Sequence, residues 1–190
     1  MKFCCVIPFY NEDERIINTL DIVSSVAEFS EIICVDDGSI DNAKNIIVRR
    51  FPHIQLYIHE INKGKTTAIA TALSHTTADA IFLLDADLQH LHAQELRKAI
   101  ENFSKGMYDM IILRRIKSPW FIKLNRADLL FTGQRILWRN DIETILRLPV
   151  YNYEIESAIN KFMRKNKKKV GWIPSEMLNT FKVFKKTAAV

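Results

Sequence analysis

The stretch Ile81-Phe82-Leu83-Leu84-Asp85-Ala86-Asp87-Leu88-Gln89 contains the pattern that decides the fold class. Its short run of branched and aromatic residues predicts a buried strand rather than a helix, and two carboxylates follow directly. Ligands of open α/β sheets bind just beyond the carboxyl ends of the strands, where these aspartates would lie. Asp85, Asp87 and Gln89 supply the hard oxygen ligands that suit Mg²⁺ or Mn²⁺. The alternative is that the aspartates cap the helix that follows, since Asp is a favoured capping residue.

Strand and helix patterns alternate through the first 115 residues of the chain. Strands are predicted over residues 2–8, 31–35, 54–58, 80–84 and 109–113. Helices are predicted over residues 11–27, 41–50, 65–74 and 92–103. This alternation predicts right-handed βαβ units that form a mainly parallel sheet flanked by helices, which is the α/β fold class.

The alternation of strand and helix patterns stops after Arg115, where the chain becomes more aromatic and basic. Helices are predicted over residues 128–146 and 153–163, and a strand over residues 169–173. We therefore divide one domain into a nucleotide-binding half, residues 1–115, and a partly helical acceptor-side half, residues 116–190. A chain of 190 residues is long enough for one substantial hydrophobic core.

The composition predicts a soluble, cytoplasmic protein with a mild basic bias. The net charge is +5 and the pI is about 9.1, which favours anionic partners. All three cysteines lie in apolar runs without metal-ligand spacing, so we expect reduced core thiols. No apolar run approaches the ~20 residues of a membrane span, and we expect no signal peptide.

The basic run from Arg164 to Lys169 has two interpretations. It is either a solvated loop or a peripheral contact with an acidic membrane surface at the cytoplasmic face. The run contains no interleaved aromatic residues that could stack on bases, so nucleic acid is not an expected partner.

The segment Gly64-Lys65-Thr66 matches the end of a P-loop, but the rest of that motif is missing. A P-loop needs a glycine five residues before Gly64, and His59 occupies this position. A dinucleotide site is also disfavoured, because no Gly-x-Gly-x-x-Gly follows the first strand. The remaining interpretation places several strand ends around one nucleotide diphosphate.

Four motifs, in a fixed order, carry a resemblance to a known family. They are Val6-Ile7-Pro8-Phe9-Tyr10-Asn11-Glu12, Asp36-Asp37-Gly38-Ser39-x-Asp41, Asn62-x-Gly64-Lys65-x-x-Ala68 and Leu84-Asp85-Ala86-Asp87-x-Gln89. The chain thereby resembles the family 2 glycosyltransferases, and among them the polyprenyl-phosphate sugar transferases, including the dolichyl-phosphate mannose synthase group. The resemblance implies a GT-A fold that accepts a UDP- or GDP-linked sugar and uses Mg²⁺ or Mn²⁺.

The resemblance also implies which residues bind the donor and the metal. The implied donor-binding residues are Pro8, Tyr10, Glu12, Asp37, Lys65, Asp85, Ala86 and Asp87. The implied metal ligands are Asp85, Asp87 and Gln89. Asp37, in preference to Asp36, would accept hydrogen bonds from the base, and its alternative role is to cap the following helix. The alternatives are core packing for Tyr10 and a solvated position for Lys65.

Three residues are implied in catalysis and one in acceptor binding. Asp87, through the metal, and Arg115 would offset the charge on the leaving nucleoside diphosphate. Glu156, which we favour over Glu154, is a candidate general base for a hydroxyl acceptor. Arg135, in Thr132-Gly133-Gln134-Arg135, would bind an acceptor phosphate through its planar fork of donors. The alternative for Arg135 is a surface ion pair with Asp128 or Asp141.

The sequence therefore predicts an inverting, metal-assisted hexosyltransferase that uses a nucleotide-diphosphate sugar. The expected acceptor is a lipid phosphate or a glycan, and Arg135 with the basic run would direct the enzyme to a phosphorylated lipid. One alternative is a nucleotidyltransferase acting on a sugar phosphate, although the acidic segment after the first strand would repel a triphosphate. The other is a catalytically weak protein that binds nucleotide sugars.

Overall fold

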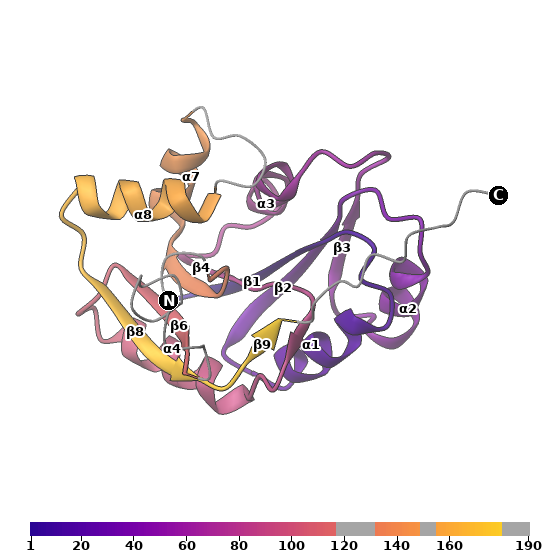
Figure 1. Ribbon diagram of the computed structural model, residues 1–190, viewed down its shortest axis with the longest axis horizontal. Coiled ribbons are helices and arrows are strands. Elements are labelled where there is room, and N and C mark those ends of the chain that lie inside the picture. Colours follow the sequence, from indigo (N-terminus) through magenta and orange to yellow (C-terminus); the bar gives the residue numbers. More distant parts are fainter. Residues whose placement is uncertain (117–131, 149–154, 180–190) are drawn as a thin grey trace.

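The computed structural model describes residues 1–116, 132–148 and 155–179 of the 190-residue chain. Its main feature is a seven-stranded sheet with the strand order β3-β2-β1-β4-β7-β6-β8 (Figure 1). The strands are β1 Phe3–Phe9, β2 Phe29–Asp36, β3 Gln55–Ile58, β4 Ala80–Leu83, β6 Met110–Arg115, β7 Arg135–Trp138 and β8 Val170–Ser175. A separate two-stranded sheet pairs β5 Leu88–Gln89 with β9 Leu178–Asn179.

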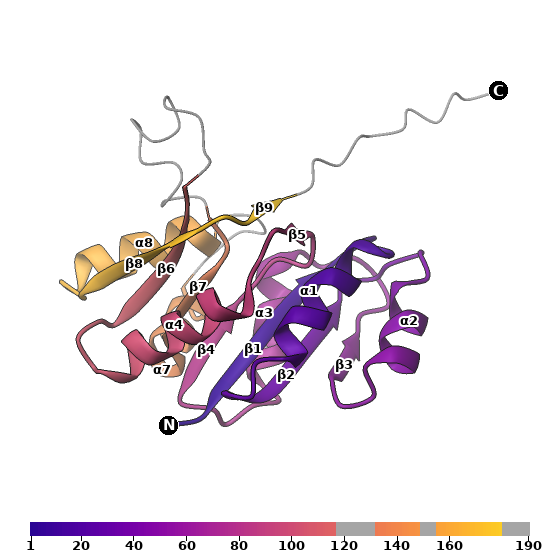
Figure 2. The same ribbon diagram turned by 90° about the horizontal axis from the view of Figure 1, so that it is seen from below.

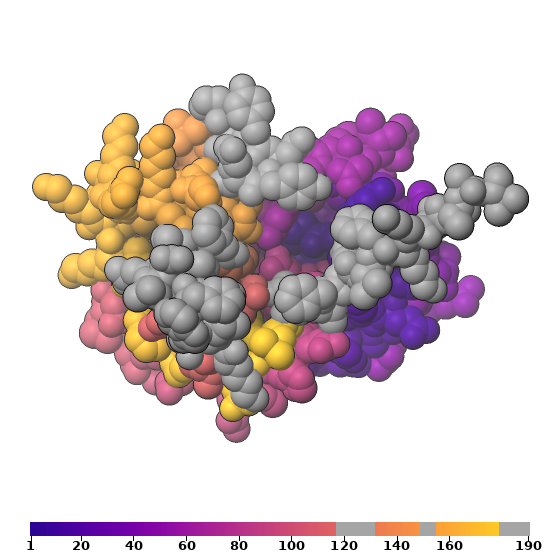
Figure 3. Space-filling model, in the orientation of Figure 1, coloured from indigo at the N-terminus to yellow at the C-terminus, as the bar shows by residue number. Residues whose placement is uncertain are grey.

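Helices cover both faces of the sheet. They are α1 Arg15–Ser24, α2 Ala43–Arg50, α3 Lys65–Leu73, α4 Ala93–Ser104, α7 Arg139–Leu146 and α8 Ile155–Lys165. Apolar residues of α1, α2 and α4 form one core cluster with the sheet, and those of α3, α7 and α8 form a second. Figures 1 and 2 show these helix groups on opposite sides of the strands. In the space-filling view of Figure 3, the later elements, in orange and yellow, lie largely on the left, and the first elements, in indigo and purple, lie on the right. This two-faced α/β architecture confirms the predicted fold class.

Alternation along β1 explains why a nearly continuous apolar run forms a central strand. Cys5 and Ile7 belong to the first core cluster, whereas Cys4 and Val6 belong to the second. Successive side chains of a strand point to opposite faces, so a strand covered on both faces must be apolar at every position. The cysteines are free and buried as predicted, and burial raises the pKa of the Cys4 thiol to about 12.

The strand β7 corrects the helix predicted over residues 128–146. Within the described sheet, β7 alone runs antiparallel, and its Arg135 lies opposite Leu83 of β4 and Ile112 of β6. Ile136 and Leu137 are fully buried in the core clusters on opposite faces of the sheet. Only three apolar residues, Ile136 to Trp138, stand between Arg135 and Arg139, and this run is too short to indicate a strand. The helix prediction was therefore wrong over residues 132–138, whereas α7 confirms it over Arg139–Leu146. Residues 128–131 lie outside the described part of the chain.

The start of α1 is a second correction. The helix predicted to open at residue 11 begins at Arg15 and ends at Ser24, before the predicted limit. Asn11 and Asp13 have φ angles of 53° and 42°, which are left-handed rather than helical. Asn and Asp adopt this conformation more readily than most residues. The segment therefore forms a turn before α1 and not the first turn of the helix. In the described ranges, no helix is long and apolar enough to cross a membrane.

Candidate functional site

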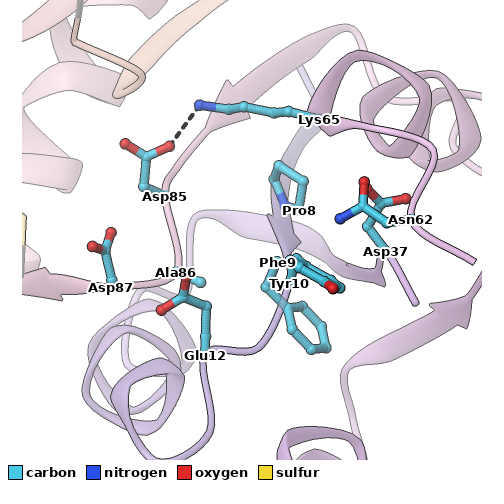
Figure 4. A pocket seen from close by; sticks show the side chains of 10 residues that line it. All are labelled: Pro8, Phe9, Tyr10, Glu12, Asp37, Asn62, Lys65, Asp85, Ala86 and Asp87. Atoms are coloured by element: carbon cyan, nitrogen blue, oxygen red, sulfur yellow. Dashed lines mark hydrogen bonds and ion pairs between the residues drawn. The ribbon is translucent and has the colours of Figure 1, made fainter. Parts of the chain in front are cut away.

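The carboxyl ends of β1, β2 and β4 meet at one edge of the sheet. Phe9 pairs with Asp36, Val6 pairs with Leu83, and the Asp37 N–H donates to the Phe9 carbonyl at 2.8 Å. The loops after these strands surround a pocket of about 200 Å³ (Figure 4). It is lined by Pro8, Phe9, Tyr10, Glu12, Asp37, Asn62, Lys65, Asp85, Ala86 and Asp87. The structure thus brings together all eight residues that were predicted to bind the donor. Asn62, which belongs to the third motif, and Phe9 also line this pocket.

The two sides of the pocket carry different polar groups, two carboxylates on one side and a carboxylate with an amide on the other. Figure 4 shows Asp85 and Asp87 on one side, and Asp37 and Asn62 on the other. Tyr10 retains 39% exposure, so its alternative role in core packing is wrong.

Asp37 is buried and fastens the loop that precedes α3. Its Oδ1 accepts hydrogen bonds from His59 Nδ1 at 2.7 Å and from the Lys63 backbone N–H at 2.9 Å. Its Oδ2 accepts the Gly64 N–H at 2.7 Å. These donors all come from residues 59–64, so Asp37 does not cap α2. Sequence reasoning missed His59, because it considered this position only as the missing P-loop glycine.

Asp41, rather than Asp37, accepts a hydrogen bond from the start of α2, and Asp36 lies away from the pocket. The N–H of Ala43, at the start of α2, donates to Asp41 Oδ1 at 3.1 Å. Asp36 is fully buried and accepts the Ser39 N–H at 2.8 Å, and it is not among the residues that line the pocket. The preference for Asp37 over Asp36 at the pocket is therefore consistent with the geometry.

Gly38 permits the close contact between the Asp37 turn and the loop before α3. Its φ is +80°, a left-handed conformation that favours glycine. A Cβ at this position would lie 2.5 Å from the Ile61 carbonyl carbon and 2.7 Å from the Asn62 nitrogen. The glycine of the Asp-Asp-Gly-Ser motif is therefore required by packing as well as by backbone conformation.

Lys65, the first residue of α3, places a positively charged ammonium group in the site. Its Nζ lies 2.7 Å from Asp85 Oδ1 and 2.7 Å from Glu156 Oε1 on α8. Burial lowers the pKa of Lys65, but the Asp85 and Glu156 carboxylates outweigh it and raise the pKa above its ordinary value. The ammonium is therefore held in its charged form between two carboxylates, and its alternative role as a solvated helix residue is wrong.

The segment Thr132-Gly133-Gln134 packs directly on Asp85. Gln134 Nε2 donates to Asp85 Oδ2 at 2.5 Å, and Thr132 Oγ1 donates to Gln134 Oε1 at 2.5 Å. A Cβ at Gly133 would lie 2.7 Å from Asp85 Oδ1 and 2.9 Å from Lys65 Nζ. The predicted motif singled out this segment, but the function of Gln134 in holding Asp85 was missed.

Arg135 lies in the interior rather than at an acceptor-facing surface. Its side chain has no exposed area, and its guanidinium donates to the Thr132 carbonyl and to Asn160 Oδ1. Burial lowers the pKa of Arg135 to about 10, and the nearby Glu156 and Asp85 carboxylates oppose that shift. The alternative ion pair with Asp141 is wrong, because Asp141 pairs with Lys168 at 3.0 Å. Asp128, the other alternative partner of Arg135, lies outside the described residues.

The structure places the other predicted residues in different positions. Arg115 ends β6 opposite Ser175, at the same edge of the sheet as the aspartates, and it is not among the pocket-lining residues. Gln89 is exposed on β5 and lines a separate surface depression with Asn18 and His90. Gln89 is therefore not brought to the pocket that contains the two predicted aspartate ligands.

The pocket provides some, but not all, of the oxygen ligands that a hard divalent cation needs. Asp85 and Asp87 are two carboxylates in one pocket, and oxygen donors of this kind suit Mg²⁺ and Mn²⁺. The described residues contain no group of three or more His, Cys, Asp or Glu side chains that could hold a metal. A metal here would need oxygens from a bound phosphate to complete its coordination.

The pocket lies beyond the carboxyl ends of the strands of a mainly parallel sheet, which is where open α/β proteins bind their ligands. Residues 4–173 match the family model of glycosyl transferase family 2, so the chain belongs to this family. The family and the enzyme class predicted from the sequence, a glycosyltransferase, are thereby confirmed. The match does not distinguish the dolichyl-phosphate mannose synthase group from other members.

Solved structures with the same fold include several of glucosyl-3-phosphoglycerate synthase from Mycobacterium tuberculosis. The complex with Mn²⁺, UDP and phosphoglyceric acid has a TM-score of 0.76 and 16% identity, over 95% of this chain and 71% of that chain. The complex with Mn²⁺, UDP-glucose and phosphoglyceric acid has a TM-score of 0.77 and 16% identity, over 96% and 73%. The complex with Mg²⁺ and UDP has a TM-score of 0.75 and 16% identity, over 95% and 72%. At this identity the likeness shows the fold, and it confirms the predicted GT-A type.

Proposed function

We propose that the protein transfers a hexose, with inversion, from a nucleoside-diphosphate sugar to an acceptor, assisted by Mg²⁺ or Mn²⁺. The observation that carries this proposal is the single pocket in which the ends of β1, β2 and β4 and the start of α3 converge. Membership of glycosyl transferase family 2 supports the reaction class. The ions and UDP in the Mycobacterium tuberculosis structures support the cofactor and the kind of donor.

The polar groups on the two sides of the pocket favour one orientation of the donor, with its base at Asp37 and Asn62 and its diphosphate at Asp85 and Asp87. A base has N–H groups that can donate to the Asp37 carboxylate, so the nucleoside belongs on that side. The diphosphate then reaches Asp85 and Asp87, which would hold the metal together with phosphate oxygens. When bound, the metal offsets the negative charge that develops on the leaving nucleoside diphosphate. Arg115, at the same sheet edge, would add positive charge on the far side of β7.

Lys65 and Glu156 form the proposed link between the donor and acceptor sides. Lys65 contacts Asp85 and Glu156 at the same distance of 2.7 Å. The ammonium would hold the Glu156 carboxylate beside the transferred sugar, where it could accept the proton of a hydroxyl acceptor. A phosphate acceptor is already anionic and needs little such help. The role of Glu156 as general base therefore applies to the glycan alternative.

We propose a phosphorylated acceptor, such as a lipid phosphate, with a glycan as the second class. The phosphoglyceric acid bound in the Mycobacterium tuberculosis complexes supports a phosphate-bearing acceptor. The burial of Arg135 argues against direct contact with that phosphate. Its hydrogen bonds to the Thr132 carbonyl and Asn160 favour a role in holding the Thr132–Gln134 segment under Asp85.

The basic segment Arg164–Lys169 would contribute to membrane attachment separately from the acceptor site. Helix α8 begins next to Glu156 and ends at this segment. With a rise of 1.5 Å per residue, the two ends of α8 are about 15 Å apart. A peripheral contact with acidic lipid would therefore use one end of α8, and the chemistry would use the other.

The decisive experiment measures donor binding and sugar transfer separately. Calorimetry with UDP- and GDP-linked hexoses, with and without Mn²⁺, tests binding. Release of nucleoside diphosphate in the presence of polyprenyl phosphate, phosphoglycerate or an oligosaccharide tests transfer. Failure of every donor and every nucleoside diphosphate to bind, with or without metal, would contradict the proposal.

Two other outcomes would favour the alternative functions. Binding without transfer or donor hydrolysis, across all three acceptors, would indicate a non-catalytic binding protein. Release of pyrophosphate from a nucleoside triphosphate and a sugar phosphate would indicate a nucleotidyltransferase. The acidic Glu12 and Glu14 after β1 argue against this second outcome, because they would repel a triphosphate.

A further inference from the structure

The hydrogen-bonding capacity of Asp37 is largely used by the protein itself. A carboxylate has two acceptor positions on each oxygen. Oδ1 accepts from His59 Nδ1 and from the Lys63 N–H, which fills both of its positions. Oδ2 accepts the Gly64 N–H, which leaves one position among the contacts of the described residues. Because Asp37 lines the pocket, a ligand can donate one hydrogen bond to this carboxylate, but not two side by side.

His59 is held firmly in this arrangement. Its backbone N–H donates to the Asp36 carbonyl at 2.8 Å, and its Nε2 lies 2.9 Å from Thr71 Oγ1. The side chain is nearly buried, with 8% relative exposure. A carboxylate has no hydrogen to donate, so His59 Nδ1 must carry the proton in its contact with Asp37. A ligand therefore cannot free Asp37 Oδ1 without breaking a buried network.

Asn62 adds a donor beside the remaining acceptor position. Its Oδ1 accepts the same Gly64 N–H as Asp37 Oδ2, at 3.1 Å. Two acceptors that share one N–H must lie side by side. Since Oδ1 is assigned to the contact with an N–H, the NH₂ group of Asn62 remains as a donor, and no acceptor for it lies among the described residues. This exposed side chain lines the pocket, as Figure 4 shows.

We infer that this side of the pocket selects uracil over guanine, an inference that deepens the proposed function and rests on it. The N3–H of uracil is a single donor flanked by two carbonyls, and it matches the one open position of Asp37 beside the Asn62 NH₂ group. Guanine presents two adjacent donors, N1–H and N2–H, which pair best with both oxygens of one carboxylate. Because Oδ1 is filled, one of these donors stays unpaired, at a cost to affinity.

The inference is tested by the affinities of UDP, GDP and CDP, measured by calorimetry with Mn²⁺. We expect UDP to bind at least about 10-fold more tightly than either of the others. CDP is the size-matched control, because its N3 is an acceptor that would face the Asp37 oxygen. Equal affinity for UDP and GDP, or for UDP and CDP, would overturn the inference but leave the proposed function intact. Failure of all three to bind would contradict the proposed function instead.

Two substitutions at His59 test its part in the selection. Asn and Leu have similar shapes, but only the Asn side chain can replace the Nδ1–H donor to Asp37. His59→Leu should free an Oδ1 position and lower the UDP-to-GDP affinity ratio at least several-fold, whereas His59→Asn should keep the ratio of the unmodified protein. The same change of ratio in both variants would overturn the role of His59. Circular dichroism shows whether each variant is folded.

The exposed Asn62 provides a variant that does not disturb the core. Asn62→Asp replaces the donor by a second acceptor, which suits the two donors of guanine. The UDP-to-GDP affinity ratio should fall at least about 10-fold. An unchanged ratio in this folded variant would overturn the inference, whatever the behaviour of the His59 variants.

Discussion

Lys65 and Glu156 lie 91 positions apart in the sequence, and their Nζ and Oε1 atoms lie 2.7 Å apart. The same ammonium contacts Asp85 Oδ1, so one cation joins α3, the loop after β4 and the start of α8. The predicted nucleotide-binding half, residues 1–115, and the predicted acceptor-side half, residues 116–190, therefore both contribute to one site. Charge balance at this point depends on residues from both halves.

Replacement of Lys65 by Met should remove the cation but keep much of the side-chain volume. Asp85 and Glu156 would then lose the ammonium that each of them contacts at 2.7 Å, so we expect a loss of about 2 kcal/mol in the free energy of unfolding. Transfer activity should fall about 100-fold or more, because the site loses a fixed positive charge. Urea denaturation and donor turnover measure these effects. The control is Lys161→Met, an exposed position on α8, and similar losses in both variants would contradict the assignment.

The ion pairs of Lys65 should be insensitive to moderately alkaline pH. The carboxylates raise the pKa of Lys65 above its ordinary value of ~10.4, although burial acts against them. Stability from such a group is fully present below the ordinary pKa and is lost only as pH rises through the higher folded pKa. The stability difference between the unmodified protein and Lys65→Met should therefore be the same at pH 7 and at pH 9. A difference that had fallen to half by pH 9 would disprove the raised pKa.

Gly133→Ala should disturb the site without unfolding the protein. The added Cβ would lie 2.7 Å from Asp85 Oδ1 and 2.9 Å from Lys65 Nζ, so these side chains must move. We expect a stability loss of about 1–3 kcal/mol and donor affinity at least about 10-fold weaker, measured by thermal denaturation and calorimetry.

Gly106→Ala is the matched control for Gly133→Ala. No heavy atom lies within 4 Å of a Cβ at Gly106, but its φ of +70° is unfavourable for Ala. The control should lose about 1 kcal/mol of stability and keep its donor affinity. Unchanged donor affinity in Gly133→Ala would show that the Asp85–Lys65 pair does not take part in donor binding.

Asp87→Ala should abolish metal-dependent function and leave the fold intact. A metal ligand at a strand end contributes several kcal/mol to transition-state stabilisation, so turnover should fall at least about 100-fold. The free energy of unfolding should change by about 1 kcal/mol or less. Mn²⁺-dependent donor binding, measured by calorimetry, is the direct readout. Asp21→Ala, which removes an exposed ion pair with Arg50, is the control, and unmodified turnover in Asp87→Ala would show that Asp87 has another role.

The membrane proposal predicts that exposed basic residues near the end of α8 bind acidic lipid. Lys165, Lys167 and Lys169 are exposed, and their joint replacement by Ser should abolish flotation with phosphatidylserine vesicles. Each basic residue near an anionic surface contributes roughly 1 kcal/mol, and the attraction should weaken as salt rises. Equal flotation of both proteins, or no flotation of either, would contradict the proposed contact between these basic residues and acidic lipid.

Lys168 must be kept in that variant, because it has a structural role. Its ammonium lies 3.0 Å from Asp141 Oδ2 and 3.5 Å from Asp109 Oδ1. Lys168→Ser alone should therefore lower stability while leaving flotation unchanged. Loss of flotation in this single variant would place Lys168 in the lipid contact instead.

The amino-acid sequence by itself determined the strands whose ends form the pocket, β1, β2 and β4, and most of the residues that line it. Apolar runs that end in carboxylates, at Asp36-Asp37 and Asp85-Ala86-Asp87, marked where buried strands stop. Parallel strands share one edge for their carboxyl ends, so residues after different strands had to meet there. All eight predicted donor-binding residues do line one pocket for this reason. Gln89 does not, because β5 begins at Leu88, directly after Asp87, and its pairing with β9 leaves the Gln89 side chain exposed outside the pocket.

Only the tertiary structure decided the contacts that complete the site. The antiparallel insertion of β7 buries Arg135, and the pairing of His59 with Asp37 restricts the base-binding carboxylate. The link from Lys65 to Glu156 likewise joins segments that follow unrelated local patterns. Each of these contacts spans at least 22 positions of sequence and depends on which strands and helices become neighbours. Hydrophobic periodicity records which face of an element is buried, but not which polar partner it meets there.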